Sequence, residues 1–542
     1  MSFLATIYTN IAAAPAQDAL LEVVESGFNT VSRSMLLDLI NRARTALQEH
    51  GIKPGDRVAL LGGNSASWVA ADLAILSEGA TMVPLYVRQS GAEMAHAMND
   101  CQPSIVVVAD SGLLQTLSAA WPEHCEILTY EQLFAGEATT KEPYALGPDD
   151  IVTIIYTSGT SGPAKGVMLS RANVDFMLPT TQTALAGIVG TREVDKVFHF
   201  LPFCFAGSRI MLWTQLYRGN PLMVSTDLNR LVAELQTADP NYYLNVPMVL
   251  ERIRRGVSEK LQERGGFALS LYRGGLEAAA RVRMGTASVA DRIQLAAAKM
   301  IVFPKIRQTI GPSLEFLICG SAPLSADTQR WFETLGIPVY QVYGLTETTA
   351  IVTMDTPKSA EGGKVGVAID GVEMRVTEDG ELVTRGPHIF HGYWKLPAAT
   401  ESAIQDGWFH TGDKAEIDGE GRLRIIGRVK HLLVMESGHN VPPEPIEEAI
   451  RTACPEIEHA FLVGHGRPFL SVIVTGPVSA EQIQLALDQA SQGLPHYKKL
   501  RKFHHSDEPF TPENGLLTAN SKMKRRVIDE HFTEVINGMY QK

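Results

Sequence analysis

The feature that most constrains the fold of this 542-residue chain is the alternation of short apolar runs with helical patterns. Residues 57–61 and 105–109 are runs rich in β-forming residues and bounded by Gly, Asn or Pro, and 67–78 reads as a helix that is apolar on more than one face. Such alternation is typical of βαβ units and predicts a largely parallel sheet. Residues 150–156 and 314–319 predict two more buried strands, each leading into a glycine-containing loop. In open α/β sheets, ligands bind at such strand-to-loop junctions.

Two segments depart from this α/β pattern. Residues from about 251 to 308 are rich in Arg and Ala and predict inserted helices, whereas 371–427 has the short strands and tight turns of a small β-barrel-like subdomain. A chain of this length is too long for one ordinary core. We therefore expect a large multilayer α/β N-terminal domain, residues 1–428, and a small mobile α+β C-terminal domain, residues 429–542.

Composition narrows the classes of function. The net charge is −12, and an acidic chain gains no counterion-release energy from nucleic acid, which makes nucleic acid an unfavourable partner. The five cysteines show no CxxC spacing, which argues against disulfides and structural zinc and favours a reducing compartment. We find no signal-peptide pattern and no run of roughly 18 apolar residues. These observations predict a cytoplasmic protein, with contact at a membrane surface left open.

The strongest local signal follows the strand predicted at 150–156. It combines hydroxyl residues and glycines with one lysine: Thr157, Ser158, Gly159, Thr160 and Lys165. Glycines let backbone N–H groups turn toward an anion, hydroxyls add donors, and lysine supplies a countercharge. The segment lacks the Gly-Lys-Ser/Thr ending of a Walker A loop. It predicts a phosphate-binding loop, and an ordinary surface loop rich in Ser and Gly is the alternative.

A second cluster follows the strand predicted at 314–319. Its members are Gly320, Ser321, Ala322, Tyr343, Gly344, Thr346 and Glu347. A tyrosine ring can stack on a base, a threonine can donate to a phosphate, and a carboxylate can hold magnesium among phosphate oxygens. Taken alone, a glutamate such as Glu347 is more often a solvated surface carboxylate.

Two further clusters lie nearer the C-terminus. Asp413 follows a glycine turn, from which an aspartate can accept hydrogen bonds from both hydroxyls of a ribose; a turn cap is the alternative. Arg428 and Lys430 come shortly afterwards. Lys522 lies in a basic stretch and can neutralise charge on a carboxylate that attacks phosphorus, whereas a solubilising basic tail is the default interpretation.

Taken in this order, the four clusters resemble the acyl- and aryl-adenylate-forming superfamily, which includes acyl-CoA synthetases, peptide-synthetase adenylation domains and beetle luciferase. The resemblance extends from about residue 31 to residue 526. It implies ATP, Mg²⁺ and coenzyme A as cofactors and co-substrates. A scaffold with this fold but no activity would have lost nucleotide-binding residues, and all of them are present.

The resemblance also implies roles for single residues. The loop from Thr157 to Lys165 would hold the β- and γ-phosphates, although the Pro-Lys of the family is Ala164-Lys165 here. The adenine site would contain Gly320, Ser321, Ala322, Gly344 and a stacking Tyr343. Thr346 would contact the α-phosphate, and Glu347 and Thr160 would ligate magnesium. Asp413 would bind the ribose, Arg428 would follow it in the nucleotide site, and Lys522 would promote adenylation.

The second half-reaction of the family, thioester formation, implies a moving C-terminal domain. Lys430 falls at the family's hinge, and Gly438 matches the glycine loop that faces the thioester-forming site after rotation. Phe205, Ala206 and Gly207 match the segment that leads to the acyl pocket. Many acyl-CoA synthetases have His where this chain has Phe205, so no acid–base role is carried over. His431 stands where many family members have Asp. Histidine at this position is familiar among long-chain acyl-CoA synthetases.

The segment 434–447, the insertion and the C-terminal tail look most like long-chain and very-long-chain fatty acyl-CoA synthetases. The resemblance therefore implies a fatty acid as substrate and CoA as acceptor. One rival is an acyl-AMP ligase that loads an acyl carrier protein; those enzymes typically carry an extra insertion that this chain lacks. The other alternative is a CoA ligase for another hydrophobic carboxylic acid. The arginines of the insertion suit anionic lipid, a solvated helical face or a subunit contact, so a homodimer also stays open.

Overall fold

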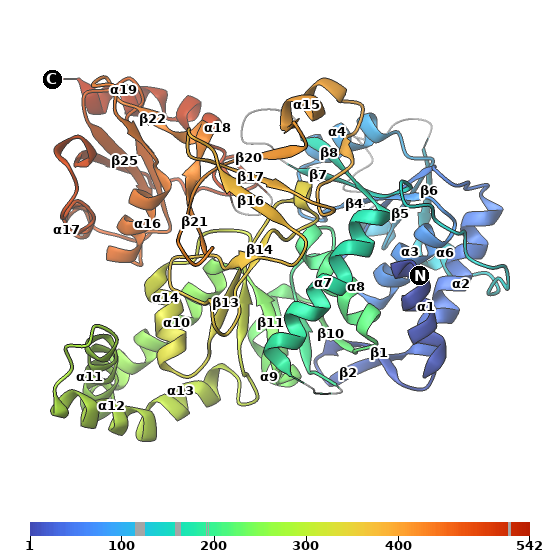
Figure 1. Ribbon diagram of the computed structural model, residues 1–542, viewed down its shortest axis with the longest axis horizontal. Coiled ribbons are helices and arrows are strands. Elements are labelled where there is room, and N and C mark those ends of the chain that lie inside the picture. The colour runs from blue at the N-terminus through green and yellow to red at the C-terminus, as the bar shows by residue number, and fades with distance from the viewer. Residues whose placement is uncertain (114–124, 158–163, 191, 193, 519–521, 542) are drawn as a thin grey trace.

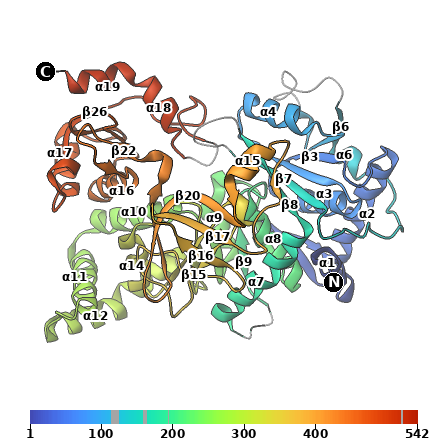
Figure 2. The same cartoon turned by 45° about the horizontal axis from the view of Figure 1, so that its top comes forward.

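The computed structural model describes residues 1–113, 125–157, 164–190, 192, 194–518 and 522–541 (Figure 1). A large N-terminal domain occupies most of the view, and the smaller C-terminal domain lies at the upper left. A helical lobe projects at the lower left, below the small domain (Figure 1). The same three parts stay separate when the molecule is turned (Figure 2).

The largest sheet of the N-terminal domain has nine strands, and its central part is parallel. In spatial order they are β15 (Val367–Ala368), β14 (Thr353–Met354), β13 (Val339–Tyr343), β12 (Leu317–Cys319), β11 (Tyr242–Asn245), β9 (Val197–His199), β10 (Leu222–Ser225), β1 (Asp18–Val24) and β2 (Gly27–Ser32). Only the edge pairings of β2, β14 and β15 are antiparallel.

A second sheet has seven strands and a parallel part formed by β3 to β7. Its spatial order is β18 (Gly392–Tyr393), β8 (Lys165–Ser170), β7 (Ile151–Thr157), β4 (Thr81–Leu85), β3 (Arg57–Leu61), β5 (Ile105–Val108) and β6 (Glu126–Thr129). The two largely parallel sheets confirm the predicted α/β class.

Helices fill the space between these sheets and cover their outer faces. Apolar residues of both sheets share one core with α1 (Phe3–Ala13), α2 (Arg33–Glu49), α3 (Ala66–Ser77), α7 (Arg171–Val189) and α8 (Ala206–Arg218). The outer face of the nine-stranded sheet packs on α9 (Leu231–Ala238), α10 (Pro247–Arg264), α13 (Phe303–Ile310) and α14 (Ala326–Thr334). Helix α4 (Gly91–Cys101) covers the seven-stranded sheet, and the short α6 (Tyr130–Leu133) follows β6. Alternating layers of this kind bury both faces of a parallel sheet.

A buried ion pair joins the central helices. Arg209 of α8 pairs with Asp72 of α3 and donates to Thr153 Oγ1 at 2.6 Å. Asp72 Oδ2 accepts from Trp213 Nε1 at 2.9 Å and from Arg209 Nε at 3.3 Å. Burial raises the pKa of Asp72, and the charge of Arg209 opposes that shift. Because all four side chains are buried, each polar group depends on the others for its hydrogen bonds.

The inserted segment forms the projecting lobe. Helix α10 leads out to α11 (Gly266–Arg283) and α12 (Val289–Ile301), which pack against each other as a hairpin, and α13 leads back to the sheet (Figure 1). The predicted small β subdomain is a five-stranded antiparallel sheet of β16 (Glu373–Val376), β17 (Glu381–Arg385), β20 (Trp408–Ile417), β19 (Ile404–Gln405) and β21 (Leu423–Arg428). Helix α15 (Pro397–Ala403) packs beside it.

The small domain is built on the three-stranded sheet of β24 (His459–Val463), β25 (Leu470–Thr475) and β26 (Leu500–His505). One apolar cluster joins this sheet to α16 (Glu444–Ala453) and α17 (Ala480–Ala490), and another joins it to α18 (Arg525–His531) and α19 (Thr533–Tyr540). A short hairpin, β22 (Leu433–Val434) and β23 (Asn440–Val441), completes the domain. Among the described residues, no helix has the length and apolarity needed to cross a membrane.

Polar contacts connect the small domain to the large one. Lys524 Nζ lies 3.0 Å from Glu93 Oε1 on α4, and Arg255 of α10 donates to the carbonyl of Pro455 at 3.0 Å. Arg451 of α16 lies 3.7 Å from Glu251. These contacts hold the small domain in the orientation seen in Figure 1.

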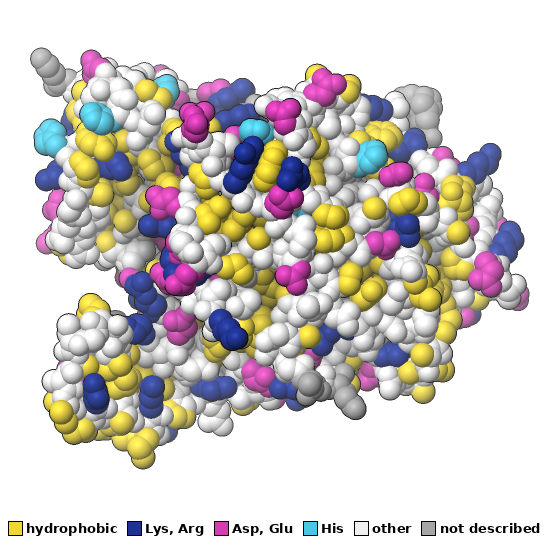
Figure 3. Space-filling model, viewed as in Figure 1, with side chains coloured by type: hydrophobic (Ala, Val, Ile, Leu, Met, Phe, Trp, Pro, Cys, Tyr) yellow, Lys and Arg dark blue, Asp and Glu magenta, His cyan; other side chains and the backbone are white. Residues whose placement is uncertain are grey.

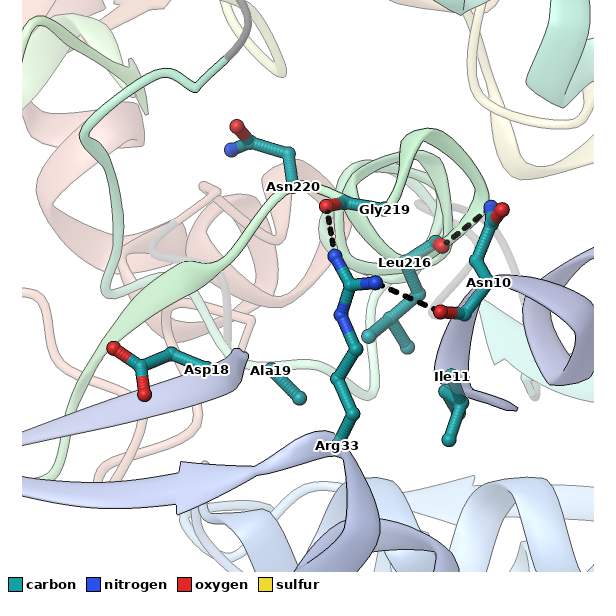
Figure 4. A pocket seen from close by; sticks show the side chains of 8 residues that line it. All are labelled: Asn10, Ile11, Asp18, Ala19, Arg33, Leu216, Gly219 and Asn220. Atoms are coloured by element: carbon teal, nitrogen blue, oxygen red, sulfur yellow. Dashed lines mark hydrogen bonds between the residues drawn. The ribbon is translucent and has the colours of Figure 1, made fainter. Parts of the chain in front are cut away.

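One small cavity lies far from these domain contacts, between α1, α2 and α8 (Figure 4). Its volume of about 10 Å³ suits a single water and excludes a substrate. Arg33 crosses it and donates to the carbonyls of Asn10 at 2.8 Å and Gly219 at 2.6 Å. The cavity therefore belongs to a structural joint that fixes the N-terminal helix to α8.

Candidate functional site

The candidate site lies where the parallel strands of the large sheet reach their carboxyl ends. Gly320, Ser321 and Ala322 follow β12 directly, and Gly344 follows β13 directly. Neighbouring strands β12 and β13 pair in register, so the two loops leave the same edge of the sheet. This is the edge at which open α/β sheets bind ligands.

Backbone geometry at this edge explains two of the predicted glycines. A Cβ on Gly344 would lie 2.1 Å from the carbonyl oxygen of Ala350, and one on Gly320 would lie 2.7 Å from Val342 Cγ2. Ser321, with φ 71°, and Ala350, with φ 81°, adopt left-handed conformations that disfavour side chains. Strained backbone of this kind collects at functional sites.

The structure brings Tyr343, Asp413 and Arg428 together. The Tyr343 hydroxyl donates to Asp413 Oδ2 at 2.6 Å, and Arg428 Nε lies 2.8 Å from Asp413 Oδ1. Burial raises the pKa of the Asp413 carboxyl, and Arg428, Tyr343 and Lys522 oppose the shift. Each carboxylate oxygen has further lone pairs, so Asp413 can accept additional hydrogen bonds from hydroxyl groups.

A second group links Glu347 to Lys165. Tyr393 of β18 donates from its hydroxyl to Glu347 Oε1 at 3.0 Å, and Lys165 Nζ lies over the Tyr393 ring, 4.7 Å from its centroid. Burial and the Glu347 carboxylate raise the pKa of Tyr393. The sequence prediction missed Tyr393, which reaches this place because β18 pairs with β8. The aromatic residues around position 393 form no motif from which a site residue could be predicted.

Lys522 enters the site from the small domain. Solvent reaches its side chain, but the surrounding protein removes part of its solvation and lowers its pKa, as does the charge of Arg428. Asp413 and Glu347 act in the opposite direction. Its backbone N–H donates to Thr518 Oγ1 at 3.1 Å. The ammonium therefore lies in the electrostatic field of the residues predicted to bind ribose and magnesium.

Part of the predicted phosphate loop lies outside the described residues: Ser158, Gly159 and Thr160. Its two ends are described. Thr157 and Lys165 pair with each other at the end of the antiparallel β7–β8 ladder. Lys165, predicted as the last residue of the phosphate-binding loop, is the first residue of β8. Thr346 lies in the short 3₁₀ helix Thr346–Thr348, whose turn is fixed by a 2.8 Å bond from Leu345 N–H to Thr348 Oγ1.

The residues predicted for the acyl pocket lie beside this site. The ring of Phe205 packs on Tyr86 at the end of β4, with 5.2 Å between centroids. Ala206 is buried in the same apolar cluster as Tyr393, and Leu345 packs against this cluster. Gly207 is exposed, with nothing within 4 Å of the position its Cβ would take. The aromatic pair of Phe205 and Tyr86 therefore lies near the residues predicted to bind the nucleotide.

The hinge and glycine-loop predictions fall on the small domain. Lys430 is exposed in the 3₁₀ helix Val429–His431, directly after β21. Gly438 lies in the exposed turn between β22 and β23, with φ 79°. Beside them, His431 Nδ1 lies 2.6 Å from Glu444 Oε1, and Arg525 pairs with Glu447. The roles of Lys430 and Gly438 stay predictions.

The described donor set fits a magnesium nucleotide. Magnesium is usually held by one or two carboxylates together with substrate phosphates and water. Glu347 supplies such a carboxylate, and Lys165 and Lys522 supply cations for phosphate oxygens. No group of three or more His, Cys, Asp and Glu residues forms a separate metal centre among the residues described.

The fold and the site define a two-domain adenylate-forming protein. The family model described as "AMP-binding enzyme" matches residues 9–394, and the one described as "AMP-binding enzyme C-terminal domain" matches residues 430–542. The chain belongs to the AMP-binding enzyme family, which confirms the resemblance stated from the motifs.

Curated relatives cover nearly the whole chain. A long-chain-fatty-acid–CoA ligase of Mycobacterium bovis is 27% identical over 96% of this chain and 94% of its own length. A long-chain-fatty-acid–CoA ligase of Gallus gallus is 29% identical over 89% of this chain and 74% of its own.

Solved structures share the fold at lower identity. The o-succinylbenzoate CoA synthetase of Bacillus subtilis, in complex with its acyl-adenylate intermediate, has a TM-score of 0.76 at 21% identity and covers 96% of this chain and 97% of that one. ATP-bound MatB of Rhodopseudomonas palustris has a TM-score of 0.75 at 24% identity, over 99% and 100% of the two chains.

Proposed function

We propose that this chain is an AMP-forming acid–thiol ligase that activates a medium- to long-chain fatty acid and transfers it to coenzyme A. The position of Lys522 within the electrostatic influence of Arg428, Asp413 and Glu347, in a member of the AMP-binding family, carries the proposal. The two relatives named as long-chain-fatty-acid–CoA ligases support the substrate class.

In this proposal the fatty carboxylate attacks the α-phosphorus of ATP, pyrophosphate leaves, and the CoA thiol then displaces AMP from the mixed anhydride. Lys522 neutralises the negative charge that gathers on the attacking carboxylate and the α-phosphate. Asp413 holds the ribose, Arg428 pairs with Asp413 in the nucleotide site, and Thr346 contacts the α-phosphate. Catalysis of this kind comes mainly from positioning and charge neutralisation.

Magnesium, when bound, would neutralise the phosphate oxygens and stabilise the leaving pyrophosphate. Glu347 is the described residue that would hold it. Tyr393 fixes one oxygen of that carboxylate through its hydroxyl, which leaves the other oxygen for the metal. Lys165, whose ammonium lies over the Tyr393 ring, would bind the outer phosphates.

The acyl chain would extend past the aromatic pair of Phe205 and Tyr86. Each buried methylene contributes about 0.8 kcal/mol, so chain length would dominate affinity. Because a long-chain fatty acid is poorly soluble in water, the proposed substrate is consistent with an enzyme that contacts a membrane surface. The five unpaired cysteines fit our proposal of a cytoplasmic location.

The test is pyrophosphate release across acids from acetate to palmitate, with and without CoA. We expect KM to fall as the chain lengthens and an acyl-CoA product to form only when CoA is present. Adenylate that accumulates regardless of CoA, and is discharged by acyl carrier protein, would instead identify a carrier-loading ligase. A KM that stays flat with chain length would contradict the fatty substrate.

Lys522→Ala tests the catalytic assignment. We expect this variant to lose adenylation and to keep thioester formation from synthetic acyl-AMP. Lys499→Ala removes another exposed lysine of the small domain and should leave both half-reactions unchanged. Loss of both steps in the Lys522 variant would refute the role given to Lys522.

A further inference from the structure

The hairpin of α11 and α12 concentrates exposed apolar surface. Seven of the 18 large hydrophobic side chains that are exposed among the described residues lie within its 267–301 segment. They are Phe267, Val282, Met284, Val289, Ile293, Met300 and Ile301. Single exposed hydrophobics are ordinary, but a gathering of this kind marks an interaction surface.

On α12 these side chains form a stripe along one face. Val289, Ile293, Ala296 and Met300 follow one another at spacings of four, three and four residues, which keeps them on the same side of a helix. Met300 is 81% exposed, Val289 76% and Ile293 66%. The opposite face carries Ala298, which is buried against the hairpin's inner core.

The same lobe is basic in a chain that is acidic overall. Residues 247–311 contain twelve Lys and Arg but five Asp and Glu, whereas the whole chain has a net charge of −12. Both acidic side chains of the hairpin, Glu277 and Asp291, contact Arg281, at 3.6 and 2.8 Å. Arg292 and Lys299 are exposed and border the apolar stripe. Figure 3 shows hydrophobic and basic side chains intermixed on this lobe at the lower left.

Charge decides which partner fits this surface. A second copy bound through a two-fold axis would oppose the stripe and its flanking Arg292 and Lys299 to themselves, placing like charges together. A bilayer that contains anionic lipid offers the opposite charge to Arg292 and Lys299 and an apolar layer for the stripe. The geometry of basic residues beside an exposed apolar helical face is that of helices that lie in the membrane interface.

We propose that the α11–α12 hairpin docks this protein on an anionic lipid surface, with Val289, Ile293 and Met300 entering the interface and Arg292 and Lys299 facing the headgroups. The hairpin stands away from the nucleotide-binding candidates, so docking leaves the site open (Figures 1 and 2). Docking would bring the enzyme to the place where a fatty acid is most concentrated.

The experiment is co-sedimentation of the full chain with vesicles of phosphatidylcholine alone or with 30% phosphatidylserine added. We expect binding to the anionic vesicles at low salt and loss of binding at 0.5 M salt, because the headgroup contacts are screened. The stripe variant V289S/I293S/M300S and the charge variant R292Q/K299Q should each bind about tenfold more weakly.

The control is V232S/L485S, which removes two other exposed hydrophobics, 71% and 59% exposed, and should bind like the parent. Absence of binding to anionic vesicles, or equal binding by the parent and both hairpin variants, would overturn the proposal. A concentration-dependent dimer that the stripe variant abolishes, measured by analytical ultracentrifugation, would assign the stripe to a second copy instead.

Vesicle binding does not require ligase activity. Pyrophosphate release with a water-soluble medium-chain acid should be the same for the parent and the hairpin variants. Failure of docking and failure of the proposed ligase reaction are therefore read in separate assays.

Discussion

The ion pair between Glu93 and Lys524 allows the orientation of the small domain to be tested. It joins α4 of the large domain to the segment that carries Lys522, with 3.0 Å between charged atoms and about a quarter of each side chain exposed. We expect Glu93→Gln to weaken the orientation in which Lys522 reaches Asp413 and Glu347. In the proposed reaction Lys522 moves away for the thioester step, so that step should not slow.

The expected magnitude follows from the exposure of the pair. A partly exposed ion pair contributes about 1 kcal/mol at most, which is roughly a fivefold change in an equilibrium. The contacts of Arg255 with Pro455 and of Arg451 with Glu251 remain in the variant. Adenylation should therefore fall about two- to fivefold and should not be abolished.

The assay measures the half-reactions separately, by pyrophosphate release without CoA and by thioester formation from synthetic acyl-AMP. Lys524→Gln and the double variant complete a mutant cycle, in which the second substitution should add little to the first. Equal loss in both half-reactions would refute the reasoning, because it would mean that the pair stabilises the fold rather than one orientation. Fully additive effects would also refute it.

Three further predictions follow from buried polar groups. Burial raises the pKa of Asp355 to about 7. Between pH 4 and 7 the folded state therefore keeps a proton that the unfolded chain loses, and the free energy of unfolding should fall by about 4 kcal/mol as the pH rises from 4 to 8. Thermal melts at different pH should show a flatter dependence for Asp355→Asn. Asp72→Ala leaves Arg209 buried and unpaired and should cost about 3–5 kcal/mol, seen as a lower melting temperature without ligand. Tyr393→Phe removes the hydroxyl bond to Glu347 but keeps the ring under Lys165, and should raise the magnesium concentration for half-maximal adenylation about tenfold, with little change in melting temperature.

The sequence predicted the strands and helices of the large domain closely where burial decides them. The run 57–61 is β3, and the helix predicted at 67–78 is α3, which begins one residue earlier because Ser65 caps it. The strand predicted at 314–319 is shorter, since only Leu317–Cys319 pair within the sheet. Apolar residues alone do not reveal where a ladder of hydrogen bonds begins.

The predicted site could be located in part. Glycines, hydroxyls and charged residues near strand ends identified Gly320, Gly344 and Asp413, because close backbone approach and buried charge require particular residue types. Tyr393 could not be predicted, since its position depends on the antiparallel pairing of β18 with β8, which lie far apart in the chain. The contact of Glu93 with Lys524 likewise depends on how two domains meet, which no local pattern records.

The bond between Arg428 and Asp413 has a consequence for retention of the intermediate. Arg428 is the last residue of β21, and the predicted hinge Lys430 follows two positions later. A rotation about Lys430 would displace Lys522 over a large distance. Arg428, two residues from the hinge, would move little. The residues proposed to bind the ribose would thus lie near the axis of the rotation, so that an acyl-adenylate could stay fixed in place while the groups around its carbonyl are exchanged.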